Sequence, residues 1–395
     1  MLFFIILFWI SLSVLFYCYL GYGLALLLFN SLRSILFSAK KNFDTIDWVP
    51  VTLIVAAYNE EKVLDQKIIN TLAIDYPADK FNIIFITDGS ADDSVNIINH
   101  YPSVTLLHQQ QRKGKFAAVK RAMQMVQTPV VIFSDANAML NKECIRRMVM
   151  HYQDKRVGGV AGEKKIIRNK RSSIIGEAEG LYWQYESFLK KQDAGFYSVA
   201  GAAGELFSIR TALFKSVDDD LILDDFITSM HICLQGYKIA YEPAAYATEL
   251  PSKSLAEEEK RKIRIAAGAY QSIGYLINCL NVFKYPLLGF QYISRRLLRW
   301  VFCPPLLFIL LFSNIFIVSN ETGHVFYTLF LYSQLCFYAF AVSGWLLVNA
   351  GKKAGLFTIP FYFVFMNYCL AKGYIRFIKG RQTVLWEKSL RQAME

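Results

Sequence analysis

Hydrophobic and polar positions divide the chain into two kinds of segment. Residues 1–30 carry almost no charge, and three further apolar runs follow Trp300, at about 301–319, 325–349 and 355–371. Apolar stretches of this length cross a bilayer as helices. The residues between them have the mixed composition of a soluble domain, and there are enough of them for one large core. We therefore expect a soluble domain flanked by transmembrane helices, one N-terminal and about three C-terminal.

Within the central region, short β-branched runs alternate with segments of helical periodicity. Strands are predicted at 51–57, 82–87 and 129–133, and helices at 61–72, 93–99 and 115–126. This alternation predicts an α/β fold with a doubly wound, mostly parallel sheet. Such sheets bind ligands beyond the carboxyl ends of their strands.

Polar residues follow each predicted strand. They are Tyr58-Asn59-Glu60, Thr87-Asp88-Gly89-Ser90 and Ser134-Asp135-Ala136-Asn137. Any one of these ends could be an ordinary helix cap, but three at one sheet edge favour a ligand site. Asp135 and Asn137 place two oxygen side chains on one side of an extended segment, as a hard divalent cation requires. Such a cation, Mg²⁺ or Mn²⁺, would hold a diphosphate.

A basic loop lies just before the third predicted helix. It contains Arg112, Lys113 and Lys115 around Gly114. The loop could be a solvated surface segment, or it could contact a nucleotide or a phosphate. The net charge of +11 fits both phosphate-bearing ligands and an anionic membrane surface. Nucleic acid is not expected as a partner, because no basic helix with interleaved aromatic residues occurs outside the membrane segments.

Segments flanking the soluble domain indicate its orientation. Residues 1–30 lack a basic start and a cleavage site, which favours a retained anchor over a signal peptide. Arg33, Lys40 and Lys41 follow this anchor and place the soluble domain in the cytoplasm. The expected organisation is an anchor at 1–30, a soluble domain at 50–280, an amphipathic helix on the membrane surface at 283–300, transmembrane segments at 301–371 and a basic tail at 372–395.

The run 355–371 leaves its topology open. It is short, contains Pro360 and Asn367, and has basic residues on both sides, including Lys353 and Lys372. Basic residues favour the cytoplasmic side. The run either spans the membrane against that rule or forms a re-entrant or interfacial hairpin.

Two further stretches of the soluble domain contain candidate functional residues. Gly201-Ala202-Ala203-Gly204-Glu205 is small enough for close backbone approach to a ligand, or it only packs a tight turn. Asp224 and Asp225 open a predicted helix, where they could cap it. A carboxylate next to another also acquires a raised pKa, which suits a general base. Further on, Arg261 and Arg264 share a helix face.

Four segments in this order resemble the membrane-bound branch of the family 2 glycosyltransferases. They are "VTLIVAAYNEE", "ITDGSADDS", "RKGKFAAVKRAM" and "FSDANAML". The resemblance covers about 50–275 and extends weakly to both membrane regions, as in synthases of bacterial cell-surface polysaccharides. It implies a GT-A fold, a nucleotide-sugar donor such as a UDP-sugar, a divalent metal, inversion at the anomeric carbon, and a multi-pass protein of the bacterial inner membrane with its catalytic domain in the cytoplasm.

The resemblance also implies roles for individual residues. Tyr58, Glu60 and Asp88 would contact the nucleotide, and Asp135 and Asn137 occupy the family's Asp-x-Asp position. Asp225 would be the general base, supported by Asp224, and the segment 201–205 would face the acceptor. Arg264, together with Lys115, would stabilise the leaving diphosphate. Processive relatives carry Gln-x-x-Arg-Trp around this arginine, and both the Gln and the Trp are absent here.

The sequence supports one leading hypothesis and three alternatives. The leading one is a metal-dependent, inverting glycosyltransferase that extends a membrane-associated glycan or lipid-linked acceptor. A single-sugar transferase acting on polyprenyl phosphate or a lipid is the nearest alternative, since few spans are available for a polymer channel. A membrane transporter or sensor with a nucleotide-binding domain, and an inactive scaffold, are the other two.

Overall fold

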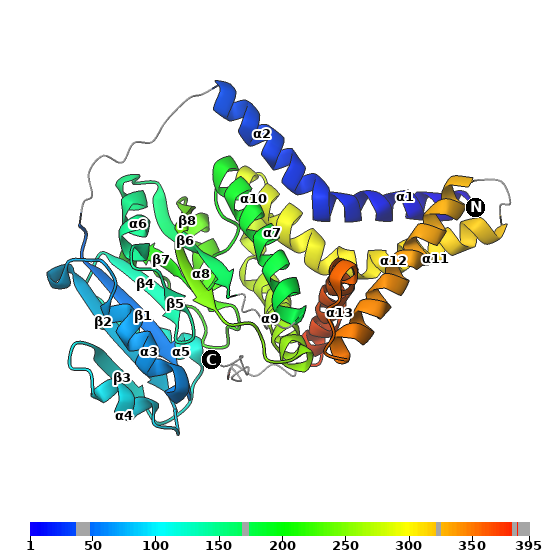
Figure 1. Ribbon diagram of the computed structural model, residues 1–395. Helices are drawn as coiled ribbons and strands as arrows, with labels where there is room; N and C mark the ends of the chain where they lie inside the picture. Colours follow the sequence, from blue (N-terminus) through cyan, green and yellow to red (C-terminus); the bar gives the residue numbers. More distant parts are fainter. Residues whose placement is uncertain (37–47, 168–173, 321–324, 381–384, 386–395) are drawn as a thin grey trace.

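The computed structural model describes residues 1–36, 48–167, 174–320, 325–380 and 385. Figure 1 shows a sheet domain from which long helices extend to one side. The basic tail expected at 372–395 lies mostly outside the described residues, as do Lys40 and Lys41.

One eight-stranded sheet forms the centre of the soluble domain, in the order β3-β2-β1-β4-β7-β6-β8-β5. Strand β1 pairs in parallel with β2 and β4, β2 with β3, and β6 with β8, whereas β7 and β5 pair antiparallel with their neighbours. The prediction of a mostly parallel sheet is therefore confirmed. The strands are β1 (Val51–Ala57), β2 (Phe81–Asp88), β3 (Thr105–Gln109), β4 (Val130–Asp135), β5 (Met139–Leu140), β6 (Val157–Ile166), β7 (Phe207–Arg210) and β8 (Lys238–Glu249).

Helices cover both faces of the sheet. All seven residues of β1 are buried: Leu53 and Val55 belong to one apolar core, and Ile54 and Ala56 belong to another on the opposite face. This is why the strand reads as a continuous apolar run. The helices of the domain are α3 (Glu61–Leu72), α4 (Ser94–Asn99), α5 (Lys115–Met123), α6 (Cys144–Met150), α7 (Ile174–Phe196), α8 (Asp224–Leu234) and α9 (Leu255–Tyr275).

The glycine-rich strand β6 was not apparent in the sequence. A side chain at Gly158 would come within 2.6 Å of Ile232, and one at Gly159 within 2.8 Å of Ile239. Close packing against these neighbours therefore requires glycine. Glycine normally weakens a strand. The glycines that permit this packing therefore also keep the segment from being predicted as a strand from its sequence.

Long helices form the second part of the chain. Two of these long helices consist of two α-helical parts joined by a π-helical stretch. One joins α1 (Leu2–Phe16) to α2 (Tyr22–Leu36), and the other joins α10 (Pro286–Tyr292) to α11 (Cys303–Asn320). The described residues contain three helices that are long and apolar enough to cross a membrane, Leu2–Leu36, Pro286–Asn320 and Val325–Asn349, the last of which is α12. Helices α1 and α11 lie side by side and share an apolar cluster (Figure 1).

The number of C-terminal spans differs from the prediction. Among the described residues, two candidate spans follow the domain instead of about three, and the run 355–371 falls on α13 (Thr358–Ile378), which is not one of them. Helix α13 packs against α9 of the soluble domain: a side chain at Gly373 would come within 2.4 Å of Ala266. Its aromatic face, including Phe361 and Phe365, is buried in protein. This packing agrees with the alternative of a re-entrant or interfacial hairpin, and the topology of the run stays a prediction.

The segment 283–300, expected as a separate surface helix, contributes to the continuous helix Pro286–Asn320. Its arginines face α7. Arg295 contacts both Glu186, at 2.9 Å, and Asp193, while Arg299 lies 2.8 Å from Glu186 and Arg296 3.7 Å from it. Burial alone would raise the pKa of Glu186, but the three arginines bring it well below its usual value. This ion-pair cluster joins the membrane helix to the sheet domain.

Replacing Glu186 by Ala should destabilise the protein by about 3–5 kcal/mol, because buried arginines would lose their counter-charge. The apparent thermal midpoint in detergent measures this. Glu259→Ala is the matched control: Glu259 pairs with Lys372 at 3.0 Å, but that pair is solvent-exposed and should contribute about 1 kcal/mol or less. Equal midpoints for the two variants would contradict the structural role of the cluster.

Candidate active site

The polar ends of β1 and β4 open into one cavity of about 660 Å³. Helices α7, α8, α9 and α13 and the membrane helix Pro286–Asn320 complete its wall. Of the residues predicted from sequence, those that line it are Tyr58, Glu60, Lys115, Asp135, Asn137, the segment 201–205, Asp224, Asp225, Arg261 and Arg264. Residues up to about 200 positions apart in the chain thus meet at one edge of the sheet.

Gly204 marks the point where the charged groups converge. A Cβ atom at this glycine would lie 3.0 Å from Lys115 Nζ, 3.1 Å from Asp225 Oδ2 and 3.7 Å from Asp135 Oδ1. Lys115 Nζ also donates to Asp135 Oδ1 at 2.5 Å. Burial alone would lower the pKa of Lys115, but Asp135, Asp224 and Asp225 raise it above its ordinary value. The lysine therefore stays charged between the acids.

Asp225 lies in the first turn of α8, and its Oδ1 accepts a hydrogen bond from the backbone N–H of Phe226 at 2.8 Å. Burial raises the pKa of Asp225 to about 7, the neighbouring Asp224 adds to the rise, and Lys115 opposes it. A carboxylate with such a pKa can accept a proton near neutral pH.

Asp135 is the last residue of β4, and Asn137 lies on the turn between β4 and β5. Asp135 is already paired with an ammonium cation, and Asn137 lines the same cavity two residues later. Among the described residues, no three His, Cys, Asp or Glu side chains cluster as a complete metal site. This donor set fits a cation that takes its other ligands from phosphate and water, as Mg²⁺ commonly does.

Buried Lys67 on α3 stabilises this turn by hydrogen bonds. Its Nζ donates to Ser134 Oγ at 2.8 Å and to the backbone oxygen of Ala138, so it grips the chain on both sides of Asp135 and Asn137. Sequence reasoning missed Lys67, since a lysine in an amphipathic helix normally faces solvent. Its position three residues after Leu64 on the buried face was the available signal.

The structure does not bring Asp88 into the cavity. Its side chain is fully buried, and its oxygens accept hydrogen bonds from the backbone N–H groups of Lys113, at 3.0 Å, and Gly114, at 2.7 Å. Arg121 lies 3.7 Å away. In this structure Asp88 orders the loop before α5 instead of facing a nucleotide. The polar strand ends in the sequence indicate the edge of the sheet at which the cavity lies. They do not distinguish a residue that contacts a ligand from one that only orders a loop.

The two arginines of α9 have different environments. Arg261 is buried against Glu258 and Glu179, with its Nη2 2.9 Å and 2.7 Å from their carboxylates. Arg264 also lines the cavity, but it forms no ion pair with any other residue that the structure describes. Burial lowers the pKa of Arg264, while Asp224 and Asp135 oppose this. Arg264 is therefore the arginine available to an anionic ligand.

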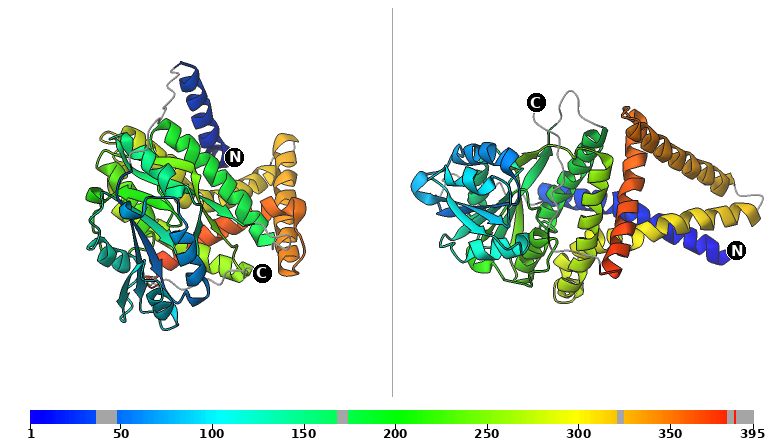
Figure 2. Two further views of the ribbon diagram at one scale, coloured as in Figure 1. Left: turned by 60° about the vertical axis from the view of Figure 1, so that its left-hand side comes forward. Right: turned by 90° about the horizontal axis from the view of Figure 1, so that it is seen from below.

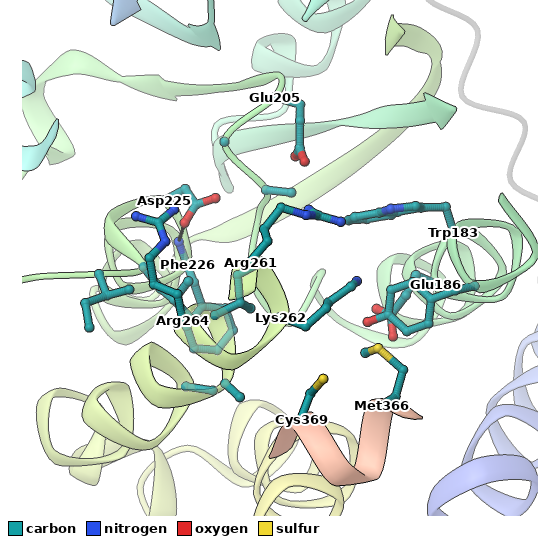
Figure 3. A pocket seen from close by; sticks show the side chains of 18 of the residues that line it. Trp183, Glu186, Glu205, Asp225, Phe226, Arg261, Lys262, Arg264, Met366 and Cys369 are labelled. Atoms are coloured by element: carbon teal, nitrogen blue, oxygen red, sulfur yellow. Dashed lines mark hydrogen bonds between the residues drawn. The ribbon is translucent and has the colours of Figure 1, made fainter. Parts of the chain in front are cut away.

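Several cavity residues could not be recognised from sequence. Trp183 and Glu186 reach it from α7 (Figure 3). Arg296 and Arg299 line it from the helix Pro286–Asn320. Their segments read as an ordinary helix and an apolar span. Only the fold brings them into the same cavity as Asp225.

The comparisons with known proteins agree with this geometry. Residues 52–218 match the model of glycosyl transferase family 2. Poly-β-1,6-N-acetyl-D-glucosamine synthase of Staphylococcus aureus (strain COL) is 27% identical over 290 residues, which cover 68% of this chain and 67% of the relative. The chain carries a family 2 glycosyltransferase domain.

Two further relatives of this glycosyltransferase extend the comparison. The synthase of the same name from Staphylococcus epidermidis is 26% identical over 233 residues, covering 56% of this chain and 55% of the relative. Mannosyltransferase PcManGT from Pyrobaculum calidifontis, solved in complex with GDP-Man and Mn²⁺, superposes with a TM-score of 0.67 at 19% identity over 95% of this chain and 100% of its own. The latter likeness shows the GT-A type fold.

Gly204→Ala should lower glycosyltransferase activity about tenfold or more while the protein stays folded. The new methyl group would displace Lys115 Nζ and Asp225 Oδ2 by a fraction of an ångström, and small misplacements of reacting groups strongly reduce rates. Gly274→Ala in α9 is the control, since no heavy atom lies within 4 Å of its added Cβ. Equal activity in the two variants would show that the convergence at Gly204 does not matter.

Proposed function

We propose that this glycosyltransferase moves a sugar from a UDP-sugar to a membrane-associated glycan or lipid-linked acceptor, with inversion, in the synthesis of a cell-surface polysaccharide. The observation that carries the proposal is the placement of Asp225, a carboxylate whose pKa burial raises to about 7. It lies beside Asp135 and Lys115 in a cavity whose wall includes membrane-helix residues. The similarity to the staphylococcal synthases supports the acceptor class.

On the donor side, Tyr58 and Glu60 would contact the nucleotide from the end of β1. Asp135 and Asn137 would hold Mg²⁺ or Mn²⁺, which when bound supplies positive charge to the donor diphosphate. Lys115 and Arg264 would add fixed cations where negative charge grows on the leaving nucleoside diphosphate. Asp88 enters only indirectly, as the anchor of the loop before Lys115.

On the acceptor side, Asp225 would accept the proton of the attacking hydroxyl group, with Asp224 supporting its raised pKa. The bond from the anomeric carbon to the acceptor oxygen forms as the bond to the diphosphate oxygen breaks. The proton stays on Asp225 and the electron pair leaves with the nucleoside diphosphate. Attack from the face opposite the leaving group inverts the anomeric carbon.

We further propose that the enzyme lies in the bacterial inner membrane with its catalytic domain in the cytoplasm. Three apolar helices support a membrane location, and Arg33 at the end of α2 supports the orientation. Transfer of a single sugar to polyprenyl phosphate or a lipid is the second candidate, because the part of the chain that the structure describes has two C-terminal candidate spans, which are few to enclose a polymer. The family domain argues against a transporter or sensor.

Purified protein incubated with a panel of UDP- and GDP-sugars should release nucleoside diphosphate only with Mn²⁺ or Mg²⁺, and fastest from a UDP-sugar. Asp135→Asn should raise the metal concentration needed for half-maximal rate, because the cation would lose its charged ligand. Turnover that persists unchanged in EDTA would contradict metal dependence. If none of the UDP- and GDP-sugars is turned over, the proposed reaction is contradicted.

The pH dependence of kcat/KM tests the base. Since only ionised Asp225 accepts a proton, the rate should climb with pH until about 7 and then level off. Asp225→Asn should reduce transfer at least about a hundredfold at every pH. The control is Asp219→Asn on the exposed loop before α8, where Asp219 only pairs with Lys120. Substantial turnover by Asp225→Asn would remove this residue as the base.

A further inference from the structure

The cavity continues beyond Asp225 toward α7, and this part has no role in the donor chemistry. Glu205 follows Gly204 directly. Trp183 projects from α7 on the side of the cavity opposite Asp225 (Figure 3). Tyr182 and Tyr362 line the same part, with ring centroids 6.1 Å apart. A ligand that reaches Asp225 from the membrane side would meet these residues first.

Two polar atoms here have no hydrogen-bond partner among the described residues. One is a donor, Trp183 Nε1, and the other an acceptor, Glu205 Oε2. Unpaired buried polar atoms are uncommon and destabilising, and each calls for an explanation. Both atoms occur on residues that line the cavity.

Lys164 connects the two residues. Its ammonium group pairs with Glu205 Oε1 and lies 4.8 Å from the centre of the Trp183 ring. It also pairs with Glu249, at 2.7 Å. Glu205 and Trp183 are therefore neighbours on one patch, and Lys164 fixes the carboxylate so that Oε2 alone is left to be satisfied.

Charge and hydrogen-bonding capacity narrow the ligand class. Three carboxylates, Glu163, Glu205 and Glu249, surround two ammonium groups, Lys164 and Lys190. This balance disfavours a phosphate group, and a fully ionised phosphate has no proton to donate to Glu205. A sugar hydroxyl both donates and accepts, and the C–H face of a sugar ring packs on aromatic side chains such as Tyr182.

We propose that Trp183 and Glu205 form a subsite for a sugar residue of the acceptor, adjacent to the residue whose hydroxyl group Asp225 activates. Trp183 Nε1 donates to one hydroxyl and Glu205 Oε2 accepts from another. This inference rests on the proposed function and narrows it, because the acceptor then already contains sugar. A stacking tryptophan of the Gln-x-x-Arg-Trp type is absent from α9, and α7 supplies an indole from the other side of the cavity.

The test compares acceptors and variants in the full-length protein. The acceptors are a β-1,6-linked N-acetylglucosamine pentamer, the same sugar on a polyprenyl diphosphate, and sugar-free polyprenyl phosphate, each with the donor that the wild type turns over. Trp183→Phe keeps an aromatic ring but loses the N–H group. It should raise the KM for a sugar-bearing acceptor at least about fivefold and lower the ratio of transfer to donor hydrolysis. Glu205→Gln should act in the same direction.

Trp345→Phe is the matched control, since Trp345 is half-exposed on α12, and it should leave both quantities unchanged. Use of the pentamer or of the lipid-linked sugar would each support the subsite and identify the source of the acceptor. Unchanged acceptor KM in both subsite variants, or transfer to sugar-free polyprenyl phosphate alone, would overturn it. If the wild type turns over no nucleotide-sugar donor at all, the proposed function itself is overturned.

Discussion

The ion pair between Lys115 and Asp135, with Asp225 beside it, is the interaction on which the arrangement of this chain depends. Lys115 begins α5, Asp135 ends β4, and Asp225 begins α8. Two acids this close in a partly buried cavity would repel each other, and the ammonium group between them makes the arrangement possible. The same balance leaves Asp225 with a pKa near 7. Only glycine at position 204 gives these groups room.

The membrane helix takes part in this arrangement. Arg296 Nε donates to the backbone oxygen of Ala200 at 3.1 Å, just before the segment that leads to Gly204. Its guanidinium lies 5.5 Å from the centre of the Phe226 ring, and Trp300 packs edge-on against the same ring. Phe226 in turn follows Asp225. Phe226, next to Asp225, and Ala200, before the segment that leads to Gly204, thus both contact a helix that is long and apolar enough to cross a bilayer. Figure 2 shows this helix extending away from the sheet domain.

The sequence predicted what depends on local pattern and failed where packing between distant segments decides. The apolar strands, their shared edge and the acidic start of α8 follow from periodicity and capping, and they placed Asp135 and Asp225 correctly in one cavity. The burial of Asp88 against the loop before α5 was not foreseen, because a buried loop anchor and a ligand contact look alike in sequence. Trp183 and the arginines of the membrane helix could not be assigned, since their roles arise only when α7 packs against that helix. The sequence left the topology of the α13 segment open, since an apolar face that packs on protein, as that of Phe361 and Phe365 does, looks like one that faces lipid.

A structure of the full-length chain with a nucleoside diphosphate and Mn²⁺ tests the central claim most directly. Anomalous diffraction locates the manganese without assumptions about the fold. The account predicts a single strong peak within coordination distance of the Asp135 carboxylate, with the nucleotide along the end of β1 and Asp225 facing it across the cavity. A peak and a nucleotide bound where neither Asp135 nor Asp225 lines the site would contradict it.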